Sequence, residues 1–230
     1  MNSFRFKQFS IRQDRAAMKV GTDSDLLGAL AAGGEHILDI GTGTGVLALM
    51  MAQRFPEAHI TAIDIDEGAV SDARENFANS PFASRLTLHH TSLQDYIATS
   101  PLYDSIVCNP PYFDKSLEAP DRSRTRARHT SSLPFRELIE GAYALLLEDG
   151  TFSVILPPEV LPAFSAECLI TGFRLSHCYR IKTVPHKSPK RYVLIYKKGQ
   201  TETTEETFCI RNADLSYSEW HDNLMKDFLL

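Results

Sequence analysis

The sequence predicts an α/β fold built on a doubly wound, mostly parallel sheet of seven strands. Short apolar runs alternate with helical patterns along the chain, as is typical of strands joined by helical crossovers. A glycine-rich turn joins the first run to an apolar helix, and the fourth run stops at an asparagine and two prolines. With 230 residues, 43% of them hydrophobic, and no repeat or low-complexity segment, we expect a single domain over residues 1–230.

The expected strands are short apolar runs that turn residues bound on both sides. In chain order they cover residues 36–40, 58–63, 86–90, 103–108, 151–156, 173–182 and 191–197. The expected helices cover residues 26–32, 46–53, 67–79, 135–147, 157–170 and 216–228. Thr22 is expected to cap the first helix, with Asp25 in the place of a capping-box acid.

The two ends of the chain are expected to pack onto this core. Residues 1–20 alternate in type, which suits a short extended arm, lid or hairpin. Residues 206–211 are a candidate for a further edge strand. Residues 206–230 as a whole form a closing segment, with a last helix that packs its apolar side inward.

The turn Gly41-Thr42-Gly43-Thr44-Gly45 indicates a loop whose backbone approaches a ligand closely. Its spacing resembles the dinucleotide fingerprint, but that pattern needs a glycine at position 46, where this chain has Val46. Asp39, just before the glycines, would repel a pyrophosphate and can instead meet a ligand ammonium. Asp64 follows the next expected strand, about 20 residues past the loop, where an acid holds the two hydroxyls of a ribose.

The fourth expected strand ends at Asn109-Pro110-Pro111-Tyr112, which indicates a small concave site for a planar amine. The prolines donate no N–H, so the sheet cannot continue, and the carbonyls of Asn109 and Pro110 remain free to accept from a ligand. The side chain of Asn109 adds an amide oxygen, and Tyr112 adds a ring on which a base can stack. An ordinary Pro-Pro turn is the alternative.

Charge and composition exclude several classes of protein. The net charge of -5 and the pI near 5.9 argue against a broadly basic surface, so any nucleic-acid site must be a local patch. The absence of a signal pattern and of a long apolar stretch predicts a cytoplasmic protein. The four cysteines lie far apart in the sequence, and this spacing predicts reduced thiols in the core rather than disulfides. No metal site is expected, because the strand neighbours His89 and His90 face opposite sides.

Several motifs together carry a resemblance to a known family. Residues 38–45 (LDIGTGTG), Asp64 and residues 109–112 (NPPY) resemble the class I S-adenosylmethionine-dependent methyltransferases that act on the N6 of adenine. The resemblance extends along essentially the whole chain to the bacterial tRNA1(Val) (adenine-37-N6)-methyltransferase family, through residues 18–23 (MKVGTD), 191–196 (RYVLIY) and 227–230 (DFLL). It implies a Rossmann-like sheet with an antiparallel last strand, S-adenosyl-L-methionine as cofactor, tRNA as partner, and a monomer that needs neither metal nor membrane.

The resemblance also implies roles for single residues. The target adenine would be bound by Asn109, Pro110, Pro111 and Tyr112. The cofactor would be bound by Met18, Thr22, Asp39, Gly41, Gly43, Gly45, Asp64, Ser92, Leu93 and Asn109. Many relatives carry an Asp where this chain has Ser92, so the side chain that contacts the cofactor's adenine stays open.

Basic residues concentrate in two expected loops. Residues 114–132 directly follow the NPPY motif, and we interpret this loop as the place where RNA phosphates bind, with a merely solvated loop as the alternative. Its arginines occupy alternate positions: Arg122, Arg124, Arg126 and Arg128. A second basic loop precedes and enters the last expected strand and contributes Lys187, Lys190 and Arg191.

Other functions stay open from the residues alone. The NPPY motif also suits methylation of a guanine N2 in rRNA or of a protein glutamine, because each substrate offers a planar amine or amide. A nicotinamide oxidoreductase is disfavoured by Val46 and Asp39. A non-catalytic RNA-binding or cofactor-binding module is the alternative from another class.

Overall fold

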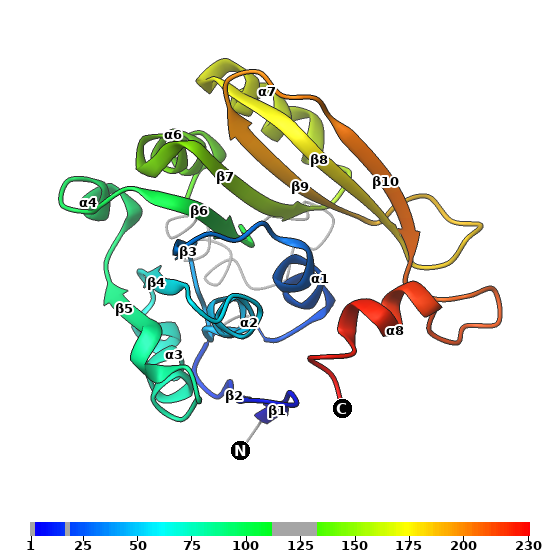
Figure 1. Ribbon diagram of the computed structural model, residues 1–230, viewed down its shortest axis with the longest axis horizontal. Helices are drawn as coiled ribbons and strands as arrows, with labels where there is room; N and C mark the ends of the chain where they lie inside the picture. The colour runs from blue at the N-terminus through cyan, green and yellow to red at the C-terminus, as the bar shows by residue number, and fades with distance from the viewer. Residues whose placement is uncertain (1–2, 17–18, 112–132) are drawn as a thin grey trace, which may run out of the picture.

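The computed structural model describes residues 3–16, 19–111 and 133–230, and an eight-stranded sheet lies at its centre (Figure 1). The strands follow the order β10-β8-β9-β7-β6-β3-β4-β5. Only β9 runs antiparallel to its neighbours in this sheet. The strands are β3 (His36–Ile40), β4 (His59–Asp64), β5 (Leu86–His90), β6 (Tyr103–Cys108), β7 (Leu146–Leu156), β8 (Phe173–Lys182), β9 (Arg191–Lys198) and β10 (Thr204–Cys209).

Helices cover both faces of the sheet (Figure 1). One apolar core packs α1, α2 and α8 against the first face, and a second core packs α4, α6 and α7 against the other. The helices are α1 (Thr22–Leu30), α2 (Val46–Arg54), α3 (Glu67–Ala78), α4 (Leu93–Ile97), α6 (Phe135–Leu145), α7 (Leu161–Thr171) and α8 (Glu219–Met225). The mostly parallel, doubly wound α/β class predicted from the sequence is confirmed.

The predicted count of seven strands is wrong, because β10 adds an eighth at the edge of the sheet, and this confirms the candidate edge strand at residues 206–211 with its bounds shifted by two residues. The antiparallel strand is β9, as expected for residues 191–197, but β10 follows it and pairs parallel with β8. The first four residues of β10, Thr204 to Thr207, are exposed and polar. Its backbone ladder with β8 holds this strand, together with the stacking of Phe208 on Trp220 and the ion pair of Glu205 with Arg180. Its exposed polar start gives only a weak apolar periodicity.

Several element boundaries also differ from the expected ones, and α4 is not among the expected helices. β7 begins at residue 146 rather than 151, because Tyr103 pairs with Leu146 while Ser105 pairs with Thr151, which leaves residues 147–150 in a bulge opposite residue 104. α7 begins at Leu161 because the prolines at 157 and 158 oppose a helix there. Gly21 is the N-cap of α1 and has no side chain to cap the helix; the Ser24 hydroxyl accepts from the Gly21 N–H at 3.3 Å, so the cap expected from Thr22 and Asp25 is not formed.

The N-terminal arm is a hairpin, one of the forms expected for it. β1 (Ser3–Arg5) pairs antiparallel with β2 (Ser10–Arg12). The rings of Phe6 and Phe9 stack with centroids 4.5 Å apart, and both side chains are buried in the core of α1 and α2. The Lys7 N–H donates to the carbonyl of Phe228 at 2.8 Å, so the two ends of the chain lie side by side (Figure 1).

Gly45→Ala should destabilise the fold more than Gly199→Ala. Both glycines have positive φ, +80° and +70°, which costs a side-chain residue about 1–2 kcal/mol. A Cβ at position 45 would lie 2.4 Å from Cε1 of the buried Phe77, whereas nothing lies within 4 Å at position 199. We expect a loss of about 2–4 kcal/mol for Gly45→Ala and about 1 kcal/mol for Gly199→Ala, measured by urea unfolding. Equal losses would show that Phe77 moves aside freely.

Candidate active site

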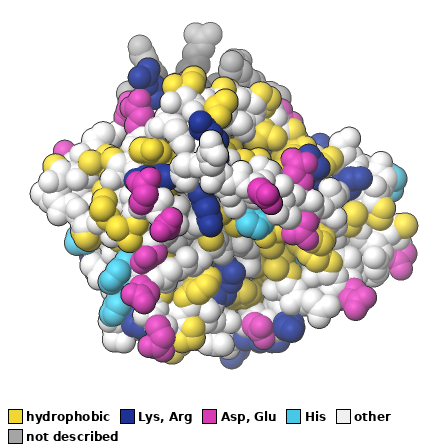
Figure 2. Space-filling view, turned by 45° about the horizontal axis from the view of Figure 1, so that its top comes forward, with side chains coloured by type: hydrophobic (Ala, Val, Ile, Leu, Met, Phe, Trp, Pro, Cys, Tyr) yellow, Lys and Arg dark blue, Asp and Glu magenta, His cyan; other side chains and the backbone are white. Residues whose placement is uncertain are grey.

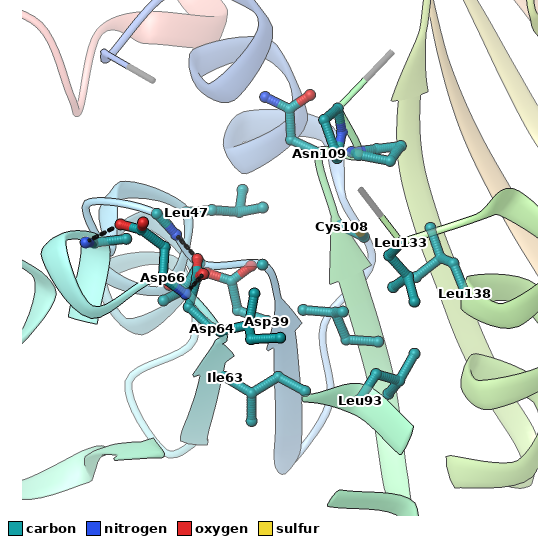
Figure 3. A pocket seen from close by; sticks show the side chains of 18 of the residues that line it. Asp39, Leu47, Ile63, Asp64, Asp66, Leu93, Cys108, Asn109, Leu133 and Leu138 are labelled. Atoms are coloured by element: carbon teal, nitrogen blue, oxygen red, sulfur yellow. Dashed lines mark hydrogen bonds between the residues drawn. The ribbon is translucent and has the colours of Figure 1, made fainter. Parts of the chain in front are cut away.

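A cavity of about 680 Å³ opens at the carboxyl ends of β3, β4 and β6 (Figure 3). Ligands bind at this edge in doubly wound folds, and the volume suits a small molecule. The cavity has two unlike walls: Asp39, Asp64 and Asp66 lie on one side, and aliphatic side chains such as Leu93 and Leu138 lie on the other (Figure 3). The structure gathers nine of the predicted site residues around it: Asp39, Gly41, Gly43, Asp64, Ser92, Leu93, Asn109, Pro110 and Pro111.

The glycine loop presents bare backbone to this cavity. Gly41 and Gly43 have φ values of +70° and +57°, and a Cβ at either position would meet nothing within 4 Å. Open space beside backbone of this kind is where a ligand can approach closely. Gly45 does not line the cavity; its lack of a side chain makes room for Phe77 of α3.

The Asp64 carboxylate holds the loop in place. Its Oδ2 accepts from the Gly43 N–H at 2.8 Å, and its Oδ1 accepts from the Asp66 N–H at 2.9 Å. Asp66 caps α3 by accepting from the Ala69 N–H. Each Asp64 oxygen keeps a second lone pair, so the carboxylate can still accept from two ligand hydroxyls.

Asp39 is buried beneath the loop and only partly satisfied. The Thr42 hydroxyl donates to Oδ2 at 2.6 Å, while Oδ1 is buried without a hydrogen-bond partner in the described structure. Burial raises the pKa of Asp39 to about 7, the Thr42 hydrogen bond opposes this, and the charge of Asp64 adds to it. A buried carboxyl with a free oxygen is suited to a cationic ligand group, which would favour its charged form.

The wall opposite the acids is built by α4, α6 and the end of β6. Leu93 is buried at the start of α4 and lines the cavity with Leu138. The Ser92 hydroxyl also lines the cavity, but it caps α4 by accepting from the Asp95 N–H and donates to the Asp95 carboxylate at 2.7 Å. The hydrogen bonds of the Ser92 hydroxyl are therefore used within the first turn of α4. The aliphatic wall suits the flat face of a ring.

Asn109 stands at one end of the cavity (Figure 3). Its Oδ1 is buried and has no hydrogen-bond partner among the residues that the structure describes. Such an acceptor is costly in a folded protein unless a ligand completes it. Pro110 and Pro111 follow and also line the cavity, while Tyr112 lies outside the described residues.

Among the described residues, two that were predicted to bind the cofactor, Gly45 and Thr22, do not line the cavity. Thr22 lies in the first turn of α1 and does not line it, and Met18 lies outside the described residues. Sequence reasoning missed several residues that do line it: Ala16, Lys19, Ser24, Ile65, Asp66, Leu133, Pro134, Glu137 and Leu138. Asp66 could have been found, because it is an acid at the start of a helix that follows a strand. The others carry no local signal.

The predicted RNA-binding residues fall into two groups. Arg122, Arg124, Arg126 and Arg128 lie outside the described residues. Lys187 and Lys190 are exposed in the loop between β8 and β9, and Arg191 makes an ion pair with Asp23 of α1 at 2.7 Å. Because Ser24 lines the cavity, this ion pair places the second basic loop beside its rim. On the face that Figure 2 shows, basic and acidic side chains are interspersed.

No metal or membrane feature emerges in the described part of the chain. It holds no group of His, Cys, Asp and Glu that could bind a metal ion. His89 and His90 are both exposed on β5, at the edge of the sheet. All four cysteines are free, three of them buried, and among the described residues no helix is long and apolar enough to cross a membrane.

Comparisons with known proteins agree with this geometry. Residues 17–160 match the family model described as "Methyltransferase small domain". A tRNA1(Val) (adenine(37)-N6)-methyltransferase from Phocaeicola vulgatus is 44% identical over 99% of this chain and 97% of its own length. One from Bacteroides thetaiotaomicron is 40% identical over the same shares. The chain belongs to the tRNA1(Val) (adenine(37)-N6)-methyltransferase family.

A solved structure supports the fold. A predicted O-methyltransferase from Agrobacterium tumefaciens superposes with a TM-score of 0.69 over 90% of this chain and 96% of that chain, at 19% identity. At that identity the likeness concerns the fold alone. It confirms the Rossmann-like methyltransferase architecture inferred for this family member.

The stability of the unliganded protein should fall as pH rises from about 4 to 7. The pKa of Asp39 is raised from 3.8 to about 7, so over this interval the folded state keeps a proton that the unfolded chain releases. Each such group makes the free energy of unfolding fall by up to about 1.4 kcal/mol per pH unit. Asp25, whose pKa burial and Asp23 also raise to about 7, adds a second contribution.

Asp39→Asn should remove the Asp39 part of this slope, as seen by urea unfolding at several pH values. The exposed Asp149→Asn serves as the control and should leave the slope as it is. An unchanged slope in Asp39→Asn would mean that Asp39 is ionised in the folded protein throughout this range.

Proposed function

We propose that this chain transfers a methyl group from S-adenosyl-L-methionine to the N6 of an adenine in tRNA, at adenosine 37 of tRNA1(Val). Relatives of about 40% identity that align along nearly the whole chain carry this activity in their names. The observation that carries the proposal is the buried, unpartnered Oδ1 of Asn109 beside a cavity edged by two prolines. A planar amine would complete that acceptor.

The residues of the cavity fit the cofactor. Asp64 would hold the two ribose hydroxyls with its remaining lone pairs. Asp39 would face the ammonium of the amino-acid part, and the bare backbone at Gly41 and Gly43 would lie against it. Leu93 and its apolar neighbours would lie against the adenine ring. When bound, this cofactor supplies an electrophilic methyl group on a sulfonium.

The chain's own contribution is to prepare the amine. The N6 lone pair of adenine is conjugated with the ring, so the nitrogen is a poor nucleophile. If the Asn109 Oδ1 and the Pro110 carbonyl each accept one N6–H, the nitrogen can pyramidalise and expose its lone pair. Holding it in line with the methyl group supplies much of the remaining rate by positioning.

The target base must leave its stack before it can reach Asn109. Swinging a base out costs a few kcal/mol, and stacking on an aromatic ring can return about 1–3 kcal/mol. Tyr112, which we propose for this stacking, lies outside the described residues. RNA phosphates would contact the two basic loops. Such an enzyme would act as a cytoplasmic monomer without metal.

A guanine N2 or a protein glutamine amide would also suit the Asn109 acceptor. The names of the full-length relatives favour adenine over both. Mass spectrometry of nucleosides, after incubation of the protein with labelled cofactor and total RNA, tests the proposal. Labelled N6-methyladenosine in tRNA is expected; label only in guanosine or in protein would overturn it.

Asn109→Ala should lower turnover by about 100-fold or more while cofactor affinity stays nearly unchanged, because its Oδ1 acts on the target amine alone. Asp64→Ala should do the reverse and weaken cofactor binding by about 1.5–3 kcal/mol. Single-turnover assays and calorimetry measure the two effects. Comparable loss of both properties in Asn109→Ala would make Asn109 a residue of the fold rather than of catalysis.

The salt dependence of tRNA affinity should show which of the two basic loops contacts RNA phosphates. Each phosphate contact to single-stranded RNA contributes a log-log slope of about -0.7, so removing two contacts should make the slope shallower by about 1–1.5 units. We expect this for Arg122→Ala with Arg124→Ala, measured as tRNA affinity across a salt series. Base choice should not change, because phosphate contacts position the RNA without specifying it.

The same series for Lys187→Ala with Lys190→Ala tests the second loop, and Arg74→Ala, an exposed arginine on α3, is the control. A slope parallel to that of the wild type would show that the loop concerned is only solvated.

A further inference from the structure

The last residue of β2 and the four residues after it, residues 12–16, lie along α3 and are called the strap here. Its backbone groups form hydrogen bonds with two polar side chains of α3, Asp72 and Asn76, which lie one helical turn apart. Asp72 is 0% exposed and Asn76 is 3% exposed. Neither side chain lines the cavity, so the proposed chemistry gives them no role.

Asp72 binds the end of the strap. Its Oδ2 accepts from the N–H groups of Arg15 and Ala16, both at 2.8 Å. A fully buried carboxylate is tolerated only where such donors satisfy it. Ala16, the second donor, lines the cavity. Asp72 therefore holds a piece of the cavity wall from behind.

Asn76 joins the strap to the glycine loop. Its Nδ2 donates to the carbonyl of Arg12 at 2.9 Å and to the carbonyl of Thr44 at 2.8 Å, while its Oδ1 accepts from the Arg12 N–H at 2.7 Å. Both amide hydrogens are thus used, one on each segment. Thr44 lines the cavity from the glycine loop, so one buried amide is bonded to both segments.

The fit between the strap and α3 is close. A Cβ on Gly68, in the first turn of α3, would lie 3.2 Å from the Arg15 carbonyl oxygen. The strap's outer contacts are of a different kind, because Glu75 makes ion pairs with Arg12 and Arg15 at 2.7 and 2.8 Å where its side chain is 35% exposed. The buried hydrogen bonds rather than these exposed pairs fix the strap.

We propose that Asp72 and Asn76 are positioning residues for the cofactor, which set the strap and the glycine loop at the spacing that S-adenosyl-L-methionine needs. The inference rests on the proposed function for the identity of the cofactor. Without these hydrogen bonds, cofactor binding would have to order the strap. Only a fraction of the protein would then be competent to bind, and the apparent cofactor affinity would be reduced in proportion to that fraction.

Calorimetry with S-adenosylmethionine and S-adenosylhomocysteine tests this in the full-length protein. Asp72→Ala and Asn76→Ala should each raise the cofactor Kd about tenfold or more, while kcat at saturating cofactor stays within about threefold of the wild type. Asp72→Asn keeps an oxygen that can accept from both amides and should restore most of the affinity. Glu75→Gln, on the same helix and facing the same strap, is the matched control and should change Kd by about twofold at most.

Thermal melts, with hydrogen exchange at the Arg12, Arg15 and Ala16 amides, separate a loose strap from a damaged fold. In Asn76→Ala, faster exchange at the Arg12 amide with a higher Kd is expected even if Asp72→Ala does not fold. An unchanged Kd in folded Asn76→Ala, or a Kd that rises equally in Glu75→Gln, would overturn the inference. Wild-type protein that binds neither ligand would instead overturn the proposed function.

Discussion

The turn between β3 and α2 is the constraint on which the rest of the site depends. It passes from strand to helix through three glycines at positive φ, a path that other residues follow only with strain. Hydrogen bonds from three residues hold the turn in place. The Ile63 carbonyl accepts from the N–H groups of Gly41 and Thr42, Asp64 accepts from Gly43, and Asn76 donates to Thr44. β4 and α3 thus fix the turn, and the turn fixes the cavity.

The acidic lining of the cavity lowers the stability of the unliganded fold, because like charges and unpartnered acceptors are held close together. Its lining includes Asp39, Asp64, Asp66 and Glu137, and Lys19 is the one basic side chain on the described lining. Two buried acceptors at the site, Asp39 Oδ1 and Asn109 Oδ1, lack a partner in the described structure. Folded proteins rarely leave such atoms unpaired except where a ligand meets them. An acidic, half-satisfied cavity suits a cofactor that carries an ammonium and a sulfonium.

The half of the sheet formed by β7, β9, β8 and β10 places a basic loop near the cavity. β9 enters antiparallel between β7 and β8, so the loop that precedes it turns back toward the carboxyl edge where the cavity opens (Figure 1). The ion pair between Arg191 and Asp23 then joins this loop to α1. A long substrate that reached Asn109 could contact Lys187 and Lys190 along the same edge. In a protein of net charge -5, we propose these lysines as one of the local patches that would contact RNA phosphates.

The sequence by itself determined the features with local causes. Apolar runs marked seven of the eight strands of the main sheet, glycines marked the turn, and the two prolines marked the end of β6, because each acts through its own backbone or its near neighbours. Only the tertiary structure decided which polar groups are buried. Asp72 and Asn76 occupy unremarkable helix positions until a strap about 60 residues earlier covers them, and β10 gains its partners, β8 and Trp220 of α8, only in the folded chain. Periodicity reports where apolar side chains point, and it carries no information about a partner that lies far away along the chain.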